Sequence, residues 1–473
     1  MVRNFSIINL LVGLLMFSLI FLIIFGTFYC PVPETKPYQI SINLEALNGL
    51  SYSQMIQDHR LYNLYRKKSV TFLDYATSGL YADSQINNFS ATLKSNLFGN
   101  THSESPSSEN STEAVNSLRY FLTKYFGTTL TNYTVVFTQN EGQAIKTFIE
   151  AFEFNDTSQF LYSKSSNYNI LGLRGLHGKS HLQVFDFNDF KVPEFDNKSF
   201  HLITFPLVDQ FDGTVVTKEQ VDAVLKLSAS NQNVFSLVDA SLYLATNKLN
   251  LTETPFSAIA ISFEKLLGFP KLGALILNNR LISLLDKPYF GGGTLVYALP
   301  GSDYVKYRTR PSERFEDGSL PFLSIVAVAN GFDLRAQLGE DNIRSHISNM
   351  TKLFKEKIEN LNNTDGTKAT VLYGNNQNSI LTFNFIDSEN KVKPFERYLK
   401  SALKNNIEIA GGCHATPGTC FKALGVSEEE LAENIDTVNV SSVGALRVSV
   451  GWANTEEDVK RFDEWLNFVV KNI

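Results

Sequence analysis

The chain has 473 residues, 43% of them hydrophobic and 12% aromatic, so it is long enough to bury a large core. Its net charge of -6 and the lack of any arginine-rich run exclude nucleic acid as the expected partner. Only three cysteines occur, Cys30, Cys413 and Cys420, and the histidines are few and scattered. We therefore expect no disulfide framework, no CxxC metal site and no histidine-based metal centre.

The first element along the chain is an apolar N-terminal segment, Ile7–Tyr29, which is long enough to span a bilayer as a helix. The residues "FGTFYCPVP" after it offer no good cleavage site, so a retained anchor is favoured over a cleaved signal peptide. Arg3 precedes the segment, whereas Glu34 and Lys36 cancel after it. The positive-inside rule then predicts a single-pass membrane protein with a lumenal or extracellular body. Glycosylation sequons agree with this topology, although an Asn-rich chain also produces some by chance; they lie at Asn88, Asn110, Asn132, Asn155, Asn197, Asn250, Asn349, Asn362 and Asn439.

The next segments predict an α/β body. A Pro-containing linker and N-terminal arm (31–70) precede apolar runs that alternate with helical patterns, such as "YTVVFT" with "GQAIKTFIEAF" and "FHLITFPLV" with "KEQVDAVLKLSAS". This alternation predicts a mostly parallel sheet covered by helices, in a large domain over 71–315. The run "GALILNN" follows its predecessor too closely for a crossover helix, so it should pair antiparallel or lie at the edge.

A second, smaller α+β domain is predicted over 316–473. A polar, turn-rich stretch, Gly301–Ser319, leads to a long helix, "LPFLSIVAVANGFDLRAQLG", and to the strands "ATVLYG", "SILTFNFI" and "ALRVSVGW". The chain thus divides into an anchor (1–30), a linker and arm, a large domain and a small domain that includes part of the arm.

Several polar residues follow apolar strands of the large domain, where ligands bind in parallel α/β sheets. Asp239 ends "VFSLVD", Ser262 ends "AIAIS", and Lys265 follows in the turn. A carboxylate directly after a buried strand calls for a cationic partner, and a protonated pyridine is one such partner. The helix that starts near Gly142 offers free backbone N–H groups suited to a phosphate. For each residue alone, a solvated lysine or a simple cap remains the plain alternative.

Together these stretches resemble the class V aminotransferase-type enzymes that use pyridoxal phosphate (PLP), the group that contains the NifS-like cysteine desulfurases. Within this group the chain is most similar to the N-terminal sulfurase domain of the molybdenum cofactor sulfurases. The resemblance runs in the family's order from about residue 70 to the C-terminus, through "FLDYATSGLY", "FGNTHS", "VVFTQNEGQAIKTFIEAF", "VDAS", "ISFEKLLGFPKLGALIL", "YFGGGT", "RFEDGS", "GGCHATPGTC" and "LRVSVGW". It implies a fold-type I PLP-dependent transferase fold and a homodimer.

The resemblance also implies roles for single residues. Lys265 matches the catalytic lysine that holds PLP as a Schiff base, and Asp239 matches the aspartate that keeps the pyridine nitrogen protonated. Arg447 matches the arginine that clamps the substrate carboxylate. The remaining predicted cofactor-binding residues are Gly142 and Gln143 at the phosphate turn, Asn167 at the ring, Ser262 before the lysine, and Thr294, which in this family often reaches a phosphate across a dimer interface.

Three departures from the family pattern affect the chemistry. Ala415 stands where the family has the cysteine that accepts sulfur, so Cys413 is the candidate thiol if the loop shifts. Asn167 replaces a histidine that stacks on the ring, and it cannot serve as an acid or base near neutral pH. Gly142 replaces a threonine of the phosphate loop, and Glu141 beside it adds a negative charge.

We therefore expect a membrane-anchored, dimeric PLP enzyme that acts on an amino acid by lyase or sulfur-transfer chemistry. The alternative is a weakly active or inactive paralogue that serves as a binding or scaffold protein. The C-terminal cofactor-binding domain of the family's sulfurases is not in this chain, so delivery of sulfur would need a separate partner.

Overall fold

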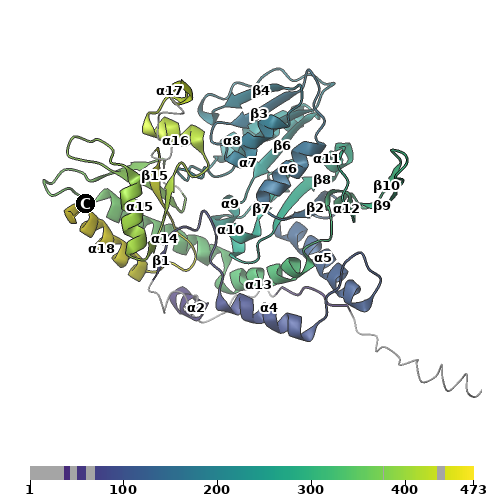
Figure 1. Ribbon diagram of the computed structural model, residues 1–473, viewed down its shortest axis with the longest axis horizontal. Coiled ribbons are helices and arrows are strands. Elements are labelled where there is room, and N and C mark those ends of the chain that lie inside the picture. Colours follow the sequence, from purple (N-terminus) through teal and green to yellow (C-terminus); the bar gives the residue numbers. More distant parts are fainter. Residues whose placement is uncertain (1–36, 43–50, 60–69, 376–377, 434–442, 473) are drawn as a thin grey trace, which may run out of the picture. The chain divides into compact units, whose positions relative to one another are not determined.

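The structure is a computed structural model that describes residues 37–42, 51–59, 70–375, 378–433 and 443–472. The predicted anchor, Ile7–Tyr29, lies outside these ranges. Within them, no helix combines the length and the apolar character needed to cross a membrane. The chain from Gln39 to Ile473 forms one compact unit that contains a large and a small sheet (Figure 1). The fold is thus of the predicted α/β class, and the exact domain boundaries stay a prediction.

The larger sheet has seven strands in the order β2-β8-β7-β6-β5-β3-β4. Strand β8 runs antiparallel to both β2 and β7, and the other neighbours are parallel. The antiparallel pairing predicted for "GALILNN" is therefore confirmed, although the strand lies inside the sheet. Because β2 and β7 both oppose β8, they run in the same direction, so β2, β7, β6, β5 and β3 all end at one edge. The strands are β2 (Tyr133–Thr138), β3 (Gln159–Ser163), β4 (His181–Phe185), β5 (His201–Pro206), β6 (Val234–Asp239), β7 (Ala258–Ser262) and β8 (Gly273–Asn278).

Both faces of this sheet are buried, which explains why its strands read as continuous apolar runs. In β7, Ile259 and Ile261 face one core, and Ala258 and Ala260 face the other. The first core is covered by α5 (Pro106–Tyr125) and α13 (Phe322–Leu338), the second by α6 (Glu141–Ala151).

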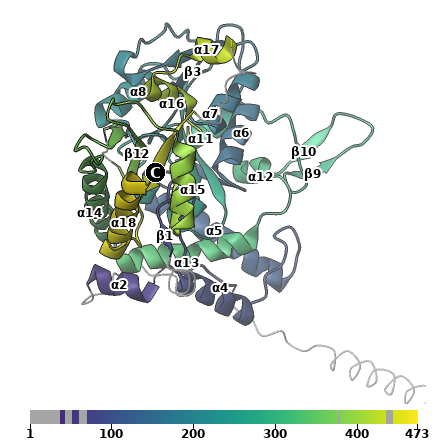
Figure 2. The ribbon, with the colours of Figure 1, turned by 60° about the vertical axis from the view of Figure 1, so that its left-hand side comes forward.

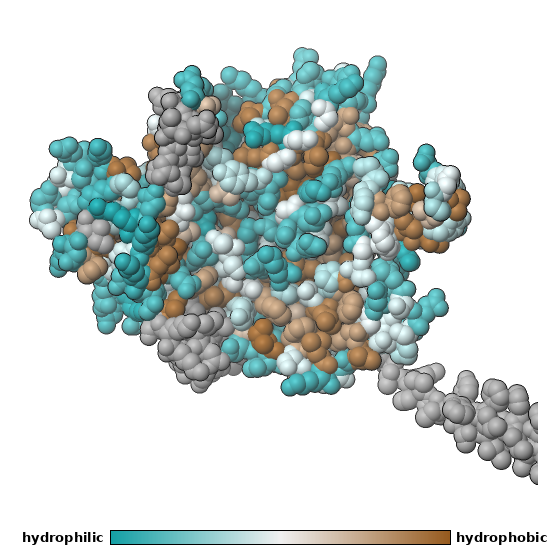
Figure 3. Space-filling view, in the orientation of Figure 1, coloured by the Kyte–Doolittle hydropathy of each residue, from teal (hydrophilic) through white to brown (hydrophobic). Residues whose placement is uncertain are grey.

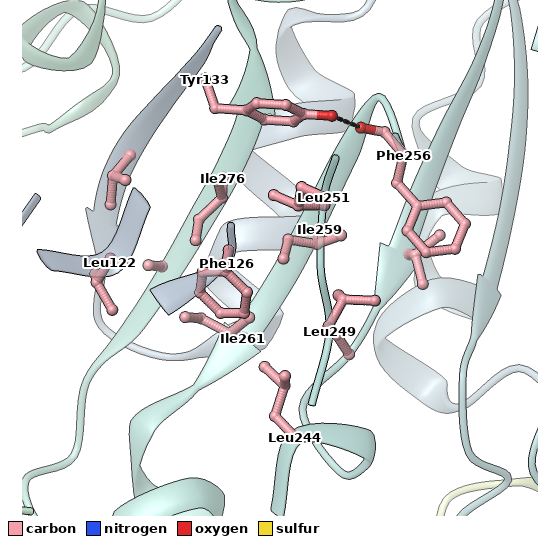
Figure 4. Packing of buried hydrophobic residues seen from close by; sticks show 14 of the residues in the cluster. Leu122, Phe126, Tyr133, Leu244, Leu249, Leu251, Phe256, Ile259, Ile261 and Ile276 are labelled. Atoms are coloured by element: carbon pink, nitrogen blue, oxygen red, sulfur yellow. Dashed lines mark hydrogen bonds between the residues drawn. The ribbon is translucent and has the colours of Figure 1, made fainter. Parts of the chain in front are cut away.

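Figure 4 shows the first core from close by, with Leu122 and Phe126 beside the isoleucines of the sheet. The Tyr133 hydroxyl in this core is satisfied, since it donates to the carbonyl of Phe256 at 2.9 Å. The packed sheet therefore gives the residues at its edge a rigid base.

The smaller sheet has the strand order β11-β12-β15-β14 and is antiparallel throughout. Helices α14 (Glu340–Glu359), α15 (Phe395–Lys404) and α18 (Glu456–Asn472) enclose a third core against it. Residues from early and late in the chain contribute to this core, such as Leu73 and Val469, and β1 (Thr71–Phe72) pairs with β13 (Ile407–Glu408) in a separate two-stranded sheet. The strands are β11 (Thr370–Tyr373), β12 (Ile380–Phe385), β14 (Ala410–Gly412) and β15 (Ala445–Ser449).

A hairpin of β9 (Leu295–Ala298) and β10 (Val305–Tyr307) was not predicted. It projects from the edge of the unit in two views (Figures 1 and 2) and carries hydrophobic surface (Figure 3). Its exposed residues include Val296, Tyr297 and Tyr304. Each of these side chains stays 44–57% exposed, so the hairpin is a candidate contact surface.

The remaining elements connect these layers. They are α2 (Tyr52–His59), α4 (Asp83–Ser95), α7 (Tyr168–Leu171), η1 (Gly172–Gly175), η2 (Phe187–Asp189), α8 (Lys218–Ser230), α9 (Tyr243–Thr246), α10 (Phe263–Leu267), α11 (Asn279–Leu284), α12 (Pro311–Phe315), α16 (Pro417–Leu424) and α17 (Glu428–Glu433).

Candidate active site

Lys265 lies on α10, the single turn of helix that follows β7 at the shared edge of the sheet. Ser262 begins this turn, and its hydroxyl accepts a hydrogen bond from the Lys265 amide at 3.3 Å. Gly268 ends it with a φ of 75°, and a Cβ at this position would lie 2.2 Å from the carbonyl carbon of Leu80. Capping at one end and a glycine at the other thus hold the lysine in one place.

The Lys265 side chain meets the start of α6. Its ammonium donates to the carboxylate of Glu141 at 2.7 Å, and the two side chains are only 10% and 13% exposed. Burial alone would raise the pKa of the Glu141 carboxyl. The Lys265 charge, together with hydrogen bonds from Lys265, from the Glu141 amide and from Ser262, outweighs burial and lowers that pKa. Glu141 is therefore ionised at neutral pH.

Two predicted phosphate-site residues occupy the same turn. The Asn140 side chain accepts from the Gln143 amide at 2.9 Å and so caps α6. The Gln143 side chain donates along the helix to Thr147 at 3.1 Å. Gly142 faces Asn169 closely, because a Cβ on it would lie 2.9 Å from the Asn169 amide oxygen. The turn is compact, and its anion-binding end already holds a carboxylate.

Asp239 and Asn167 form a buried pair further along the edge. The Asn167 amide donates to Asp239 at 2.8 Å, and the other carboxylate oxygen accepts from the Ser241 amide at 3.0 Å. The hydroxyls of Ser241 and Ser166 are buried without a hydrogen-bond partner among the described residues. The Asp239 carboxylate keeps free lone pairs; one of the unpartnered hydroxyls belongs to the residue two positions after Asp239, and the other to the residue directly before Asn167.

Arg447 lies on β15 of the small sheet and is also buried. Its guanidinium donates to Asp74 at 3.0 Å, to Thr77 at 2.8 Å and to the Gln210 carbonyl at 2.9 Å. Burial lowers the pKa of Arg447, while the charge of Asp74 works in the opposite direction. The Nε atom has no partner among the described residues. Of the three guanidinium nitrogens, Nε is thus the one that makes no hydrogen bond to the described residues and can donate to a ligand carboxylate.

The cysteine loop differs from the sequence prediction. Cys413 and Cys420 form a disulfide with a Cα–Cα distance of 5.3 Å, so the expectation of no disulfide was wrong. The cysteines are seven positions apart, and the start of α16 folds the chain back far enough to pair them. Cys413 is thus not a free thiol. Ala415, at the tip of this loop, accepts a hydrogen bond from the Tyr168 amide at 3.0 Å, which places the loop next to Asn167.

Two groups at this site were not singled out from the sequence. Burial, and then the Arg447 charge, hold the pKa of His414 well below its usual value, so the imidazole is neutral. Its Nε2 lies 3.2 Å from the Ala445 carbonyl and therefore carries the proton. Asp74, the partner of Arg447, lies inside "FLDYATSGLY"; a charge directly after a buried leucine was the signal for it.

Thr294 lies apart from this cluster. It precedes β9, and its hydroxyl donates to the Gly291 carbonyl at 2.7 Å. The loop is tied down by Asp317, which accepts from the Gly291 amide at 2.8 Å. Figures 1 and 2 show the β9–β10 hairpin at the outer edge, away from α10. Within one chain the structure thus brings together the surroundings of Lys265 and of Asp239, but it does not bring Thr294 to them.

Comparison with known proteins agrees with this arrangement. The sequence model of the family described as "Aminotransferase class-V" matches residues 71–462. Molybdenum cofactor sulfurase from Bos taurus is 29% identical over 446 residues, which cover 86% of this chain and 50% of that protein. The Arabidopsis thaliana sulfurase is 30% identical over 458 residues, covering 84% and 56% respectively. The chain spans about half the length of the curated relatives it matches.

Solved structures share the fold. The cysteine desulfurase CsdA from Escherichia coli superposes with a TM-score of 0.70 at 14% identity and covers 90% of this chain and 99% of its own. A cysteine desulfurase from Thermococcus onnurineus gives a TM-score of 0.70 at 17% identity, with 90% and 100% covered. A complex of the cystine C-S lyase C-DES with cysteine persulfide gives 0.65 at 12% identity, with 85% and 99% covered.

Proposed function

Because this chain belongs to the class-V aminotransferase family, we propose that it is a PLP-dependent enzyme that acts on an amino acid by carbon–sulfur lyase or sulfur-transfer chemistry. One observation carries the proposal: a nearly buried lysine on a capped helical turn lies at the same sheet edge as a buried aspartate. This is where α/β sheets bind ligands. The likeness to molybdenum cofactor sulfurases and to the fold of cysteine desulfurases supports the same reaction class.

The residues at the edge fit the cofactor. Lys265 supplies an amine for an aldehyde, and Asp239 supplies a carboxylate oxygen for a protonated ring nitrogen. The orphaned hydroxyls of Ser166 and Ser241 are further donors for a ligand. When bound, PLP would supply an electron sink for the substrate's α-carbon. The acidic Glu141 is the one group that fits the phosphate poorly.

Three residues of the chain are placed to handle a proton and to bind the substrate. Lys265, once freed from the ion pair with Glu141, would offer a neutral amine that can take up a proton. Arg447 orients an amino-acid carboxylate through its free Nε, since its other nitrogens are already bonded. His414 is a neutral imidazole next to Arg447, and because its pKa is lowered its Nδ1 serves as a hydrogen-bond acceptor and not as a base.

Reduction with borohydride followed by peptide mapping tests the proposal. We expect a reduced pyridoxyl adduct on Lys265 in the purified protein and none in Lys265→Ala. Lys271→Ala is the matched control, because Lys271 lies on the next exposed turn and pairs only weakly with Glu264 at 4.0 Å. An adduct that maps to Lys271, or no adduct after incubation with PLP, would contradict the assignment.

A scaffold role is the second candidate, and the disulfide favours it. The loop that would carry sulfur has Ala415 at its tip, and its two cysteines are bonded to each other. A protein of this kind would bind PLP weakly or not at all, so purified protein without yellow colour would favour it. A change in the absorption spectrum of bound PLP when one amino acid of a panel is added would favour the enzyme.

We also propose that the body is lumenal or extracellular and forms a homodimer. The disulfide supports an oxidising compartment, and most of the described sequon asparagines are exposed. The apolar hairpin β9–β10, next to Thr294, supports a second copy as its partner. A mobility shift on deglycosylation and a dimer mass in solution are expected. Protease access from the cytoplasm would contradict the topology.

A further inference from the structure

The acidic side chain of Glu141 occupies the position at which α6 is best suited to hold an anion. Glu141 is the first residue of this eleven-residue helix, where backbone N–H groups favour negative charge. Its carboxylate receives the Lys265 ammonium at 2.7 Å and hydrogen bonds from Ser262 and from its own amide. These are three donors of the kind that a phosphate group would use.

The helix does not need Glu141 as a cap, because Asn140 already accepts from the Gln143 amide. The ion pair is nearly buried, which is costly for a pair that serves stability alone. Gly142 lies against Asn169, which narrows the approach to the same donors from that side. A phosphate that enters must therefore displace the carboxylate or share the donors with it.

We propose that Glu141 is a built-in anion that competes with a ligand phosphate for these donors, and so lowers the affinity of the site for phosphorylated pyridoxal compounds without abolishing it. The inference rests on the proposed function. In it, Glu141 determines the relative affinity of the site for phosphorylated and unphosphorylated pyridoxal compounds. Glu141 acts in two ways. It repels a phosphate dianion, and it holds Lys265 as an ammonium, whose nitrogen has no lone pair for an aldehyde carbon.

The repulsion of the phosphate can be measured apart from the protonation of Lys265 in a binding experiment with ligands that carry no aldehyde. Pyridoxamine 5'-phosphate and pyridoxamine differ only in the phosphate and do not require a free Lys265 amine. Calorimetric titration compares wild type, Glu141→Gln and Glu141→Ser. The matched control is Glu264→Gln, which removes one negative charge from α10 without touching the anion position.

We expect both neutral variants at position 141 to bind pyridoxamine 5'-phosphate at least tenfold more tightly than wild type. The affinity for pyridoxamine should change less than threefold, and Glu264→Gln should match wild type. Circular dichroism and thermal unfolding confirm that each variant is folded, and agreement between Gln and Ser excludes an effect of the new side chain. Equal affinity of wild type and both folded variants for the phosphorylated ligand would overturn the proposal.

Inorganic phosphate provides a readout that does not depend on PLP. Broadening of its ³¹P resonance is expected with Glu141→Gln and not with wild type. If the variant gains phosphate binding but no protein binds either pyridoxamine compound, the role of Glu141 stands and the proposed function fails. If the variant gains neither, Glu141 is not the group that excludes the anion, and the inference fails.

Discussion

The disulfide of the cysteine loop gives a prediction whose size follows from the chain. Cys413 and Cys420 are seven positions apart, and closing a loop of that length lowers the entropy of the unfolded chain. The chain-entropy relation gives about 2.4 kcal/mol of stabilisation at 25 °C. We therefore expect reduction, or the double variant Cys413→Ala/Cys420→Ala, to lower the free energy of unfolding by about that amount.

Urea unfolding with and without reductant measures this difference. The double variant is its own control, because reductant should leave its midpoint unchanged. Thiol counting in denaturant gives an independent check. Of the three cysteines, one should react before reduction, and three should react after it. Three reactive thiols in unreduced protein purified from an oxidising compartment would refute the pairing and return Cys413 to the list of candidate sulfur acceptors.

Three further predictions concern the charged groups and the sulfur position. Lys265→Ala leaves the nearly buried Glu141 carboxylate without its cation. In protein from which PLP has been removed, this variant should lower the free energy of unfolding by about 3–5 kcal/mol at pH 8. Because the pKa of Glu141 is lowered in the folded state, the pair stabilises the protein above the carboxyl's usual value of 4.5. That contribution is lost as the pH falls below this value, so urea midpoints of wild type and variant should converge in acid, and adding Glu141→Gln should restore stability. Ala415→Cys, made in the double-alanine background to prevent disulfide exchange, should form protein-bound persulfide from cysteine where wild type forms little; equal signals would contradict the role of this position. Glu316→Ala breaks a buried pair with Arg119 (2.7 Å) and a bond from the Phe137 amide (2.8 Å), and should cost about 3–5 kcal/mol, with Glu316→Gln costing less; a midpoint equal to wild type would contradict a structural role for "RFEDGS".

Much of the fold follows from local patterns in the sequence. The buried strands are short apolar runs, and the strand after Lys265 follows too closely for any crossover, so its antiparallel direction was predictable. Lys265, Ser262 and Asp239 were found because each follows such a strand, and strand ends meet at one edge. At these positions the local sequence pattern alone indicates which residues are neighbours in the folded protein.

The parts that were missed depend on contacts between distant residues or on the path of a loop. Nothing near Asp74 in the sequence shows that it pairs with Arg447, 373 positions away. The pairing of Cys413 with Cys420 depends on the turn into α16. The β9–β10 hairpin lies partly in a stretch whose polar composition predicted only turns, and its apolar side chains face outward. The hydrophobic periodicity of a sequence indicates which residues are buried within one chain, so it does not predict an exposed apolar surface like that of the hairpin.

The pairing of β1 with β13 has a consequence for synthesis on the ribosome. The Phe72 carbonyl accepts from the Asn454 side chain, a residue made 382 positions later. At typical translation rates of about 5–20 residues per second, the N-terminal strand waits roughly 20 to 80 s for its partners. The large sheet has all of its strands by Asn278 and can form in that interval, whereas the small sheet closes only near the end of synthesis. A nascent chain that stops before β15 therefore exposes the apolar residues around β1, and this region is where we expect chaperones to bind during translation.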